Sequence, residues 1–76
     1  MSLASNLTGY SELNEHRKVD TWNAANRPGV EVNVRLDSGE VRETRTTSEA
    51  YVMCGQAVIF LLGVRGCYSL DCVTVK

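Results

Sequence analysis

Residues 30–36, Val-Glu-Val-Asn-Val-Arg-Leu, decide the fold because their apolar side chains recur at every second position. In an extended strand successive side chains point to opposite faces of the sheet, so this period separates an apolar face from a polar one. The stretch therefore predicts a β-strand with one face buried in a core.

The residues downstream of this strand predict a series of short antiparallel strands. Asp37-Ser38-Gly39 is typical of a turn, since glycine accepts positive φ readily, and residues 41–47 then return as a polar strand. A short strand ending near Gly55 and strands at 57–62 and 67–70 follow, and after a tight turn residues 73–75 form the last strand. Threonine and alternating charge along residues 41–47 indicate a solvated edge.

Upstream of the first strand the sequence predicts a helix over residues 11–26. Ser11 is a suitable N-cap, no glycine or proline interrupts the stretch, and Pro28-Gly29 ends it. Val19, Trp22 and Ala25 recur at a spacing of three and form a narrow apolar stripe that can lie against a sheet. Residues 1–10 lack an apolar period and are predicted to be a flexible tail.

The expected fold is mainly β: a small SH3-like barrel of about five short strands over residues 30–76, preceded by the N-terminal helix. Residues 11–76 then form one small domain. The alternative is a two-layer α+β fold of order ββαβ, in which residues 48–62 are one helix on a three-stranded sheet.

The length and the net charge of the chain limit the classes of function that it can have. A chain of 76 residues has room for one core and is marginally stable alone, which makes a homo-oligomer possible. A net charge of -1 disfavours a general binder of the nucleic-acid backbone. The longest apolar run, residues 57–62, is too short to span a membrane, and no signal peptide is evident, so we expect a cytoplasmic protein without membrane contact.

Residues suited to catalysis or metal binding are sparse. The three cysteines contain no CxxC pair and are expected as apolar core residues; the alternative is a Cys67–Cys72 bridge or a metal site shared with His16. His16 is the single histidine and lies among charged helix residues. We therefore predict no catalytic residue, metal or cofactor, and a protein that is not an enzyme.

A resemblance accompanies these patterns. The residues that carry it are Trp22-Asn23-Ala24-Ala25, Pro28-Gly29, Glu43-Thr44-Arg45-Thr46, Ser48, Ala50, Gly63, Gly66, Leu70 and Val73. The chain resembles small proteins of phages, prophages and plasmids in which a short helix ending in Trp-Asn precedes a compact β-domain. The resemblance implies a host or phage protein as partner and the host cytoplasm as location, but no particular activity.

Binding is the function class that remains. Small barrels bind through aromatic grooves or polar strands, and the candidate residues of both kinds are Trp22, Arg42, Arg45, Tyr51, Arg65 and Tyr68. We expect a non-catalytic, protein-binding accessory protein of a phage or mobile element. One alternative is a nucleic-acid-binding small barrel that uses the arginines. The other is a structural or virion-assembly component that self-associates through the strand at 57–62.

Overall fold

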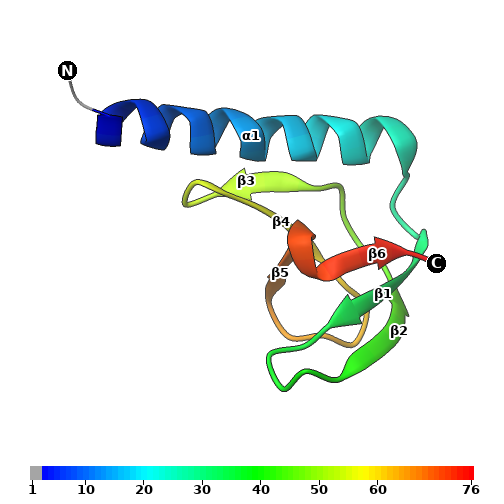
Figure 1. The fold of residues 1–76 in the computed structure, drawn as a ribbon. Coiled ribbons are helices and arrows are strands. Elements are labelled where there is room, and N and C mark those ends of the chain that lie inside the picture. The colour runs from blue at the N-terminus through cyan, green and yellow to red at the C-terminus, as the bar shows by residue number, and fades with distance from the viewer. Residues whose placement is uncertain (1–2) are drawn as a thin grey trace.

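A computed structural model describes residues 3–76, with side chains placed from Leu13 onward, and shows one helix followed by six strands (Figure 1). The elements are α1 (Leu3–Ala25), β1 (Glu31–Arg35), β2 (Val41–Arg45), β3 (Tyr51–Met53), β4 (Gln56–Phe60), β5 (Cys67–Ser69), the 3-10 turn η1 (Leu70–Cys72) and β6 (Val73–Val75). The predicted class, mainly β behind an N-terminal helix, is confirmed.

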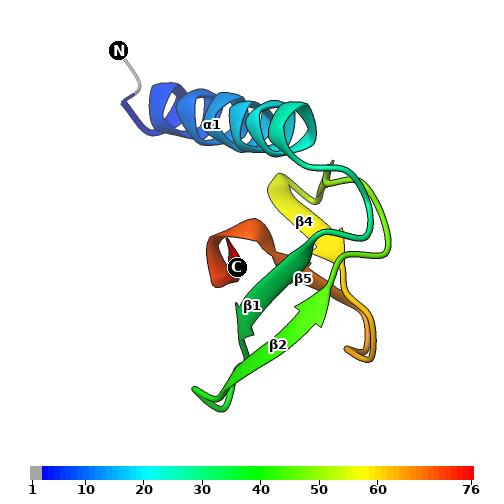
Figure 2. The same ribbon diagram turned by 90° about the vertical axis from the view of Figure 1, so that its right-hand side faces the viewer.

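The strands form two antiparallel sheets of three strands each, in the orders β2-β1-β6 and β3-β4-β5. One isolated bridge, between Thr46 and Leu61, joins the two sheets. There the Leu62 N–H donates to the Arg45 carbonyl at 2.9 Å, and the Thr47 N–H donates to the Phe60 carbonyl at 3.0 Å. Viewed from the side, α1 lies away from the β1–β2 hairpin, with β4 between them (Figure 2).

The sheets do not close into the expected barrel. In the described chain, β6 pairs with β1 on one side, and its other side is turned towards α1 rather than towards another strand (Figure 1). The helix thus occupies the open side of the strand assembly. Val19 and Trp22 of α1 pack there against the core, as the apolar stripe predicted, whereas Ala25, the third residue of that stripe, is exposed.

The core comes from the alternating residues of both sheets. Val32 and Val34 of β1 and Ile59 of β4 are fully buried, which confirms the period of two on which the fold prediction was based. Thr46 is the buried polar residue between the sheets, and its Oγ1 accepts a hydrogen bond from the Gly29 N–H at 3.0 Å.

The helix begins at Leu3 rather than at Ser11, so it includes residues 3–10 of the predicted tail, and the rest of that tail lies outside the described residues. Gly9 inside a helix costs only about 1 kcal/mol relative to alanine and does not end it. The predicted end of the helix at Asn26 is within one residue of the observed end. The helix α1 stops at Ala25, and the Asn26 N–H still donates a hydrogen bond to the Trp22 carbonyl.

The alternative in which residues 48–62 form a helix is wrong, because β3 and β4 occupy this stretch as a hairpin. Cys54 and Gly55 connect the two strands, with φ of 53° and 75° respectively. Two central residues with positive φ are characteristic of the tight turns that match the twist of a hairpin. The β-branched Val58 and Ile59 in β4 favour the extended conformation further.

Candidate functional site

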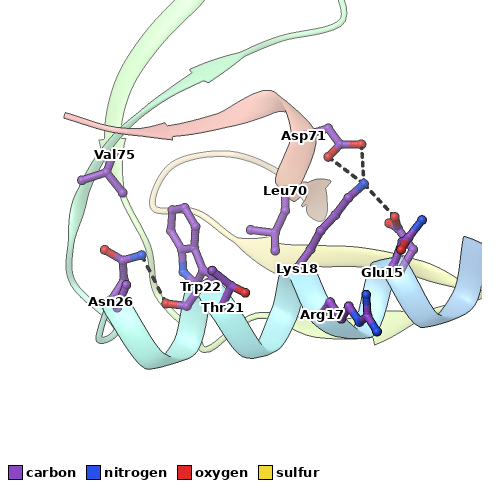
Figure 3. Close-up of a pocket in the computed structure, with 11 residues that line it drawn as sticks. Glu15, Arg17, Lys18, Thr21, Trp22, Asn26, Leu70, Asp71 and Val75 are labelled. Atoms are coloured by element: carbon purple, nitrogen blue, oxygen red, sulfur yellow. Dashed lines mark hydrogen bonds and ion pairs between the residues drawn. The ribbon is translucent and has the colours of Figure 1, made fainter.

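A groove of about 790 Å³ runs between α1 and the C-terminal segment formed by η1 and β6 (Figure 3). Residues of the C-terminal half of α1 line one wall, and residues of η1 and β6 line the other. The groove is built around Trp22, with Lys18, Ala25, Leu70, Asp71 and Val75 among its lining residues.

Trp22 and its apolar neighbours form the middle of the groove. The indole is half-buried and packs against the core, and Leu70 is only 8% exposed, whereas Val75 is 44% exposed. Asn26 holds the end of the helix, because its Nδ2 donates to the Trp22 carbonyl at 3.2 Å. An aromatic side chain fixed by the core but open on one side is the type of anchor that dominates many protein interfaces.

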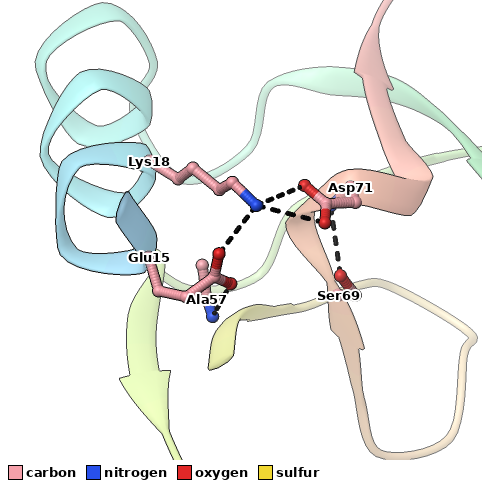
Figure 4. A network of polar contacts seen from close by, with 5 residues as sticks. All are labelled: Glu15, Lys18, Ala57, Ser69 and Asp71. Atoms are coloured by element: carbon pink, nitrogen blue, oxygen red, sulfur yellow. Dashed lines mark hydrogen bonds and ion pairs between the residues drawn. The ribbon is translucent and has the colours of Figure 1, made fainter. Parts of the chain in front are cut away.

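One end of the groove is closed by a charged network of α1 and η1 (Figure 4). Lys18 Nζ lies 2.7 Å from Glu15 Oε2 and 3.0 Å from Asp71 Oδ1. Glu15 Oε1 accepts a hydrogen bond from the Ala57 N–H at 2.9 Å. This backbone hydrogen bond and the Lys18 ammonium lower the pKa of Glu15, whereas Glu15 and then Asp71 raise the pKa of Lys18.

A second polar contact fixes the helix to the start of β3. The Asn23 Oδ1 accepts a hydrogen bond from the Ala50 N–H, and the Asn23 Nδ2 donates one to the Ala50 carbonyl. Both hydrogen bonds are 2.9 Å long. Ala50 is 4% exposed, so Asn23 satisfies two backbone groups that water reaches poorly. Together with the charged network, this contact sets the position of α1 and hence the width of the groove.

The second wall includes the outer edge of β6, the last strand of its sheet. The Lys76 N–H donates to the Glu31 carbonyl, and hydrogen-bonding direction alternates along an antiparallel strand. Thr74 therefore pairs with β1, while the N–H and C=O of Val75 point away from β1. Within the described residues no hydrogen bond occupies these two groups, so the groove contains an open strand edge.

The predicted aromatic residues do not share one site. Trp22 lines the groove. Tyr51 lies on the outer side of β3, where its ring centroid is 6.1 Å from that of Phe60. Tyr68 stands opposite Ile59 on the core side of its sheet and packs against the core. Its hydroxyl oxygen accepts a hydrogen bond from the Asp37 N–H at 3.4 Å.

The predicted arginines are also separated. Arg42 stands opposite Val34 and therefore lies on the inner side of its sheet, at an exposed edge, where its Nη2 is 4.0 Å from Glu40. Arg45 stands opposite Glu31 on the outer side. Arg65 lies in the loop between β4 and β5. Arg42 and Arg45, both predicted as binding residues, therefore lie on opposite faces of β2 and do not form one basic patch.

Several residues of the groove were not predicted from the sequence. Among them are Lys18 on α1 and, more than fifty positions later in the chain, Asp71 and Val75 on the C-terminal segment. No local sequence pattern relates the two segments. For the contact of Asn23 the sequence did contain a signal. Asn23 follows Trp22 directly, and asparagine has a low helix propensity in a helix interior. A polar residue of low helix propensity beside the apolar stripe indicates a side chain with a specific partner.

Comparison with protein-family models, with curated proteins and with solved structures finds no match to this chain. The resemblance to phage and plasmid proteins therefore stays a prediction. Among the described residues no helix combines the length and the apolar character needed to cross a membrane. The thiols of Cys54, Cys67 and Cys72 are all free, without the alternative Cys67–Cys72 bridge.

Proposed function

We propose that this protein is a non-catalytic binding module that takes an extended segment of another protein into the groove between α1 and β6. The observation that supports this most directly is the outer edge of β6, which borders a groove built around a half-buried tryptophan. An extended segment adds to such an edge through backbone hydrogen bonds, and side-chain pockets then select its sequence.

The groove offers both backbone hydrogen bonds and side-chain contacts to an extended segment. The Val75 N–H and C=O form the donor and acceptor pair that one residue of an added strand requires. Trp22 and Leu70 provide an apolar surface beside that position, and the charged network of Lys18 closes one end. This combination of an aromatic anchor, an apolar floor and a polar rim is the usual arrangement of a protein interface.

The dimensions of the groove limit the length of the bound segment. Its helix wall runs from the charged network at Lys18 to Asn26, and at 1.5 Å per residue this wall is about 12 Å long. An extended chain rises about 3.3 Å per residue, so the groove accommodates about four residues. We therefore expect a short linear segment, such as a terminus or an exposed loop, rather than a folded surface.

Nucleic-acid binding is less well supported. Arg42 and Arg45 lie on opposite sides of β2, so they cannot both contact one phosphate backbone from a single face. The net charge of -1 adds to this argument. A function in a phage or mobile element remains part of the proposal only through the resemblance of the sequence.

A displayed library of random peptides, panned on the purified protein, tests the proposal. Trp22 is the single tryptophan, so its fluorescence reports directly on whether a selected peptide occupies the groove. The informative variant is Ala25→Glu, because Ala25 is an exposed residue of the groove wall. Ala24→Glu is the matched control, since Ala24 is exposed on the neighbouring helix position outside the groove.

We expect selected peptides to bind with saturable changes in fluorescence, Ala25→Glu to weaken binding at least about tenfold, and Ala24→Glu to change it less than about twofold. Bound peptides should also protect the Val75 amide from hydrogen exchange. If selected peptides bind Ala25→Glu as tightly as the parent protein, or if no peptide binds saturably, the groove is not the binding site.

A further inference from the structure

The outer edge of β6 presents more backbone groups than the pair at Val75. Thr74 pairs with β1, and hydrogen-bonding direction alternates along an antiparallel strand, so Val73 and Val75 both direct their backbone groups away from β1. The Val73 N–H agrees with this direction, because it donates to the Leu70 carbonyl of η1. In the described part of the chain no hydrogen bond occupies the Val73 C=O. The edge therefore offers one acceptor at Val73, and a donor and an acceptor at Val75.

The side chains of β6 alternate between the two sides of its sheet. Val73 and Val75 stand opposite the fully buried Val34 and Val32, so both point to the inner side. Thr74 lies between them and is exposed on the outer side. Directly opposed residues of neighbouring strands share a side, so a strand added at this edge follows the same alternation.

We propose that the segment bound in the groove runs antiparallel to β6 and carries two apolar residues separated by one polar residue. This inference rests on the proposed function of the groove and specifies which segments it takes. The first apolar residue stands opposite Val75 and the second stands opposite Val73, so both side chains point to the inner side, where Trp22 lies. The polar residue stands opposite Thr74 and faces water on the outer side.

The inner side of the groove is suited to apolar side chains and not to charged ones. The half-buried Trp22 and the nearly buried Leu70 provide apolar surface that an apolar residue of the segment removes from water. A charged residue at the same position would lose hydration and would need a partner of opposite charge. Lys18, one helical turn before Trp22, is already shared between Glu15 and Asp71 and does not provide that partner.

The orientation of the segment decides which of its N–H groups are essential. In the antiparallel orientation the first apolar residue exchanges two hydrogen bonds with Val75, and the second apolar residue donates its N–H to the Val73 carbonyl. The N–H of the polar residue between them points away from β6. In a parallel segment this middle residue would instead be the donor to Val73, and parallel pairing is less stable per residue. Every strand pair in the described chain is antiparallel.

Synthetic peptides with single N-methyl groups test this inference. The probe is the peptide that panning of the displayed library enriches most strongly, made without modification and with an N-methyl group at each residue in turn. The methyl group removes one N–H and leaves the side chain in place. The fluorescence of Trp22, the single tryptophan, gives the affinity of each peptide. The matched protein variants are Val75→Glu and Thr74→Glu, at neighbouring exposed residues whose side chains lie on opposite sides of β6.

We expect the enriched peptides to share the apolar-polar-apolar pattern. N-methylation of either apolar residue should weaken binding at least about tenfold, and N-methylation of the polar residue between them should change it less than about threefold. Val75→Glu should weaken binding at least about tenfold, and Thr74→Glu less than about threefold. If circular dichroism shows that Val75→Glu does not fold, the methylated peptides decide, because they leave the protein unchanged.

This inference and the proposed function fail in different ways. If Ala25→Glu weakens peptide binding but the enriched peptides show no alternation, the groove is the binding site and the inference alone is overturned. The same holds if N-methylation weakens binding only at the polar residue, because that result indicates a parallel segment. If no peptide binds saturably, or if Ala25→Glu leaves binding unchanged, the proposed function is overturned and the inference with it.

Discussion

Replacing Asn23 by alanine should destabilise this protein more than any other polar substitution in the part of α1 from Leu13 onward. The change removes both hydrogen bonds to Ala50 and leaves its N–H and C=O without partners at a position that is 4% exposed. Each buried backbone group left unpaired costs about 1–3 kcal/mol, and partial access of water at the half-buried Asn23 reduces this. We expect a loss of about 2–4 kcal/mol in the free energy of unfolding.

For a domain of this length each kcal/mol lowers Tm by about 4–8 °C, so the variant should melt roughly 8–32 °C below the parent. Urea unfolding followed by far-UV circular dichroism gives the free energy. The matched control is Asn14→Ala, an exposed asparagine on the same helix, which should change stability by less than about 0.5 kcal/mol. Equal losses in the two variants would show that the Asn23–Ala50 contact does not hold the helix.

The remaining predictions concern the hairpin turn and the charged network. Cys54→Asn should raise the free energy of unfolding by about 0.5–1 kcal/mol in urea, because asparagine tolerates the φ of 53° that Cys54 adopts before Gly55. The lowered pKa of Glu15 means that its contribution is complete above the unfolded pKa of about 4.3 and is lost as pH falls through the folded value; Glu15→Gln should flatten this part of the stability profile. The raised pKa of Lys18 means that its contribution is complete below about pH 10.4 and is lost as pH rises through the folded value, and Lys18→Met should abolish that alkaline loss.

The strands could be predicted because their information is local. The alternation of Val32 and Val34 with polar residues, and a glycine at the β3–β4 turn, are each contained in a few neighbouring positions. The start of α1 was missed for the opposite reason. Residues 3–10 have weak helix propensity and no apolar period, so no local pattern there predicts a helix.

The candidate site depends on contacts that no local pattern encodes. Asn23 meets a residue 27 positions away, Glu15 one 42 positions away and Lys18 one 53 positions away. Their geometry follows from how the two sheets place β3, β4 and η1 around the helix. The positions of Arg42 and Arg45, in contrast, could have been predicted, because residues three apart on a strand point to opposite faces.

The contact between Lys18 and Asp71 also determines when the groove exists during folding. Its two walls come from opposite ends of the chain, so neither the helix nor the last strand creates the groove alone. Closing so long a loop is entropically costly and is compensated only after the sheets have formed. The amides of Thr74 and Lys76, which pair with β1, should therefore exchange with solvent through a local opening that leaves the sheet β3-β4-β5 intact. The protein would then lose its binding groove reversibly, at a lower free energy than the one that unfolds its core.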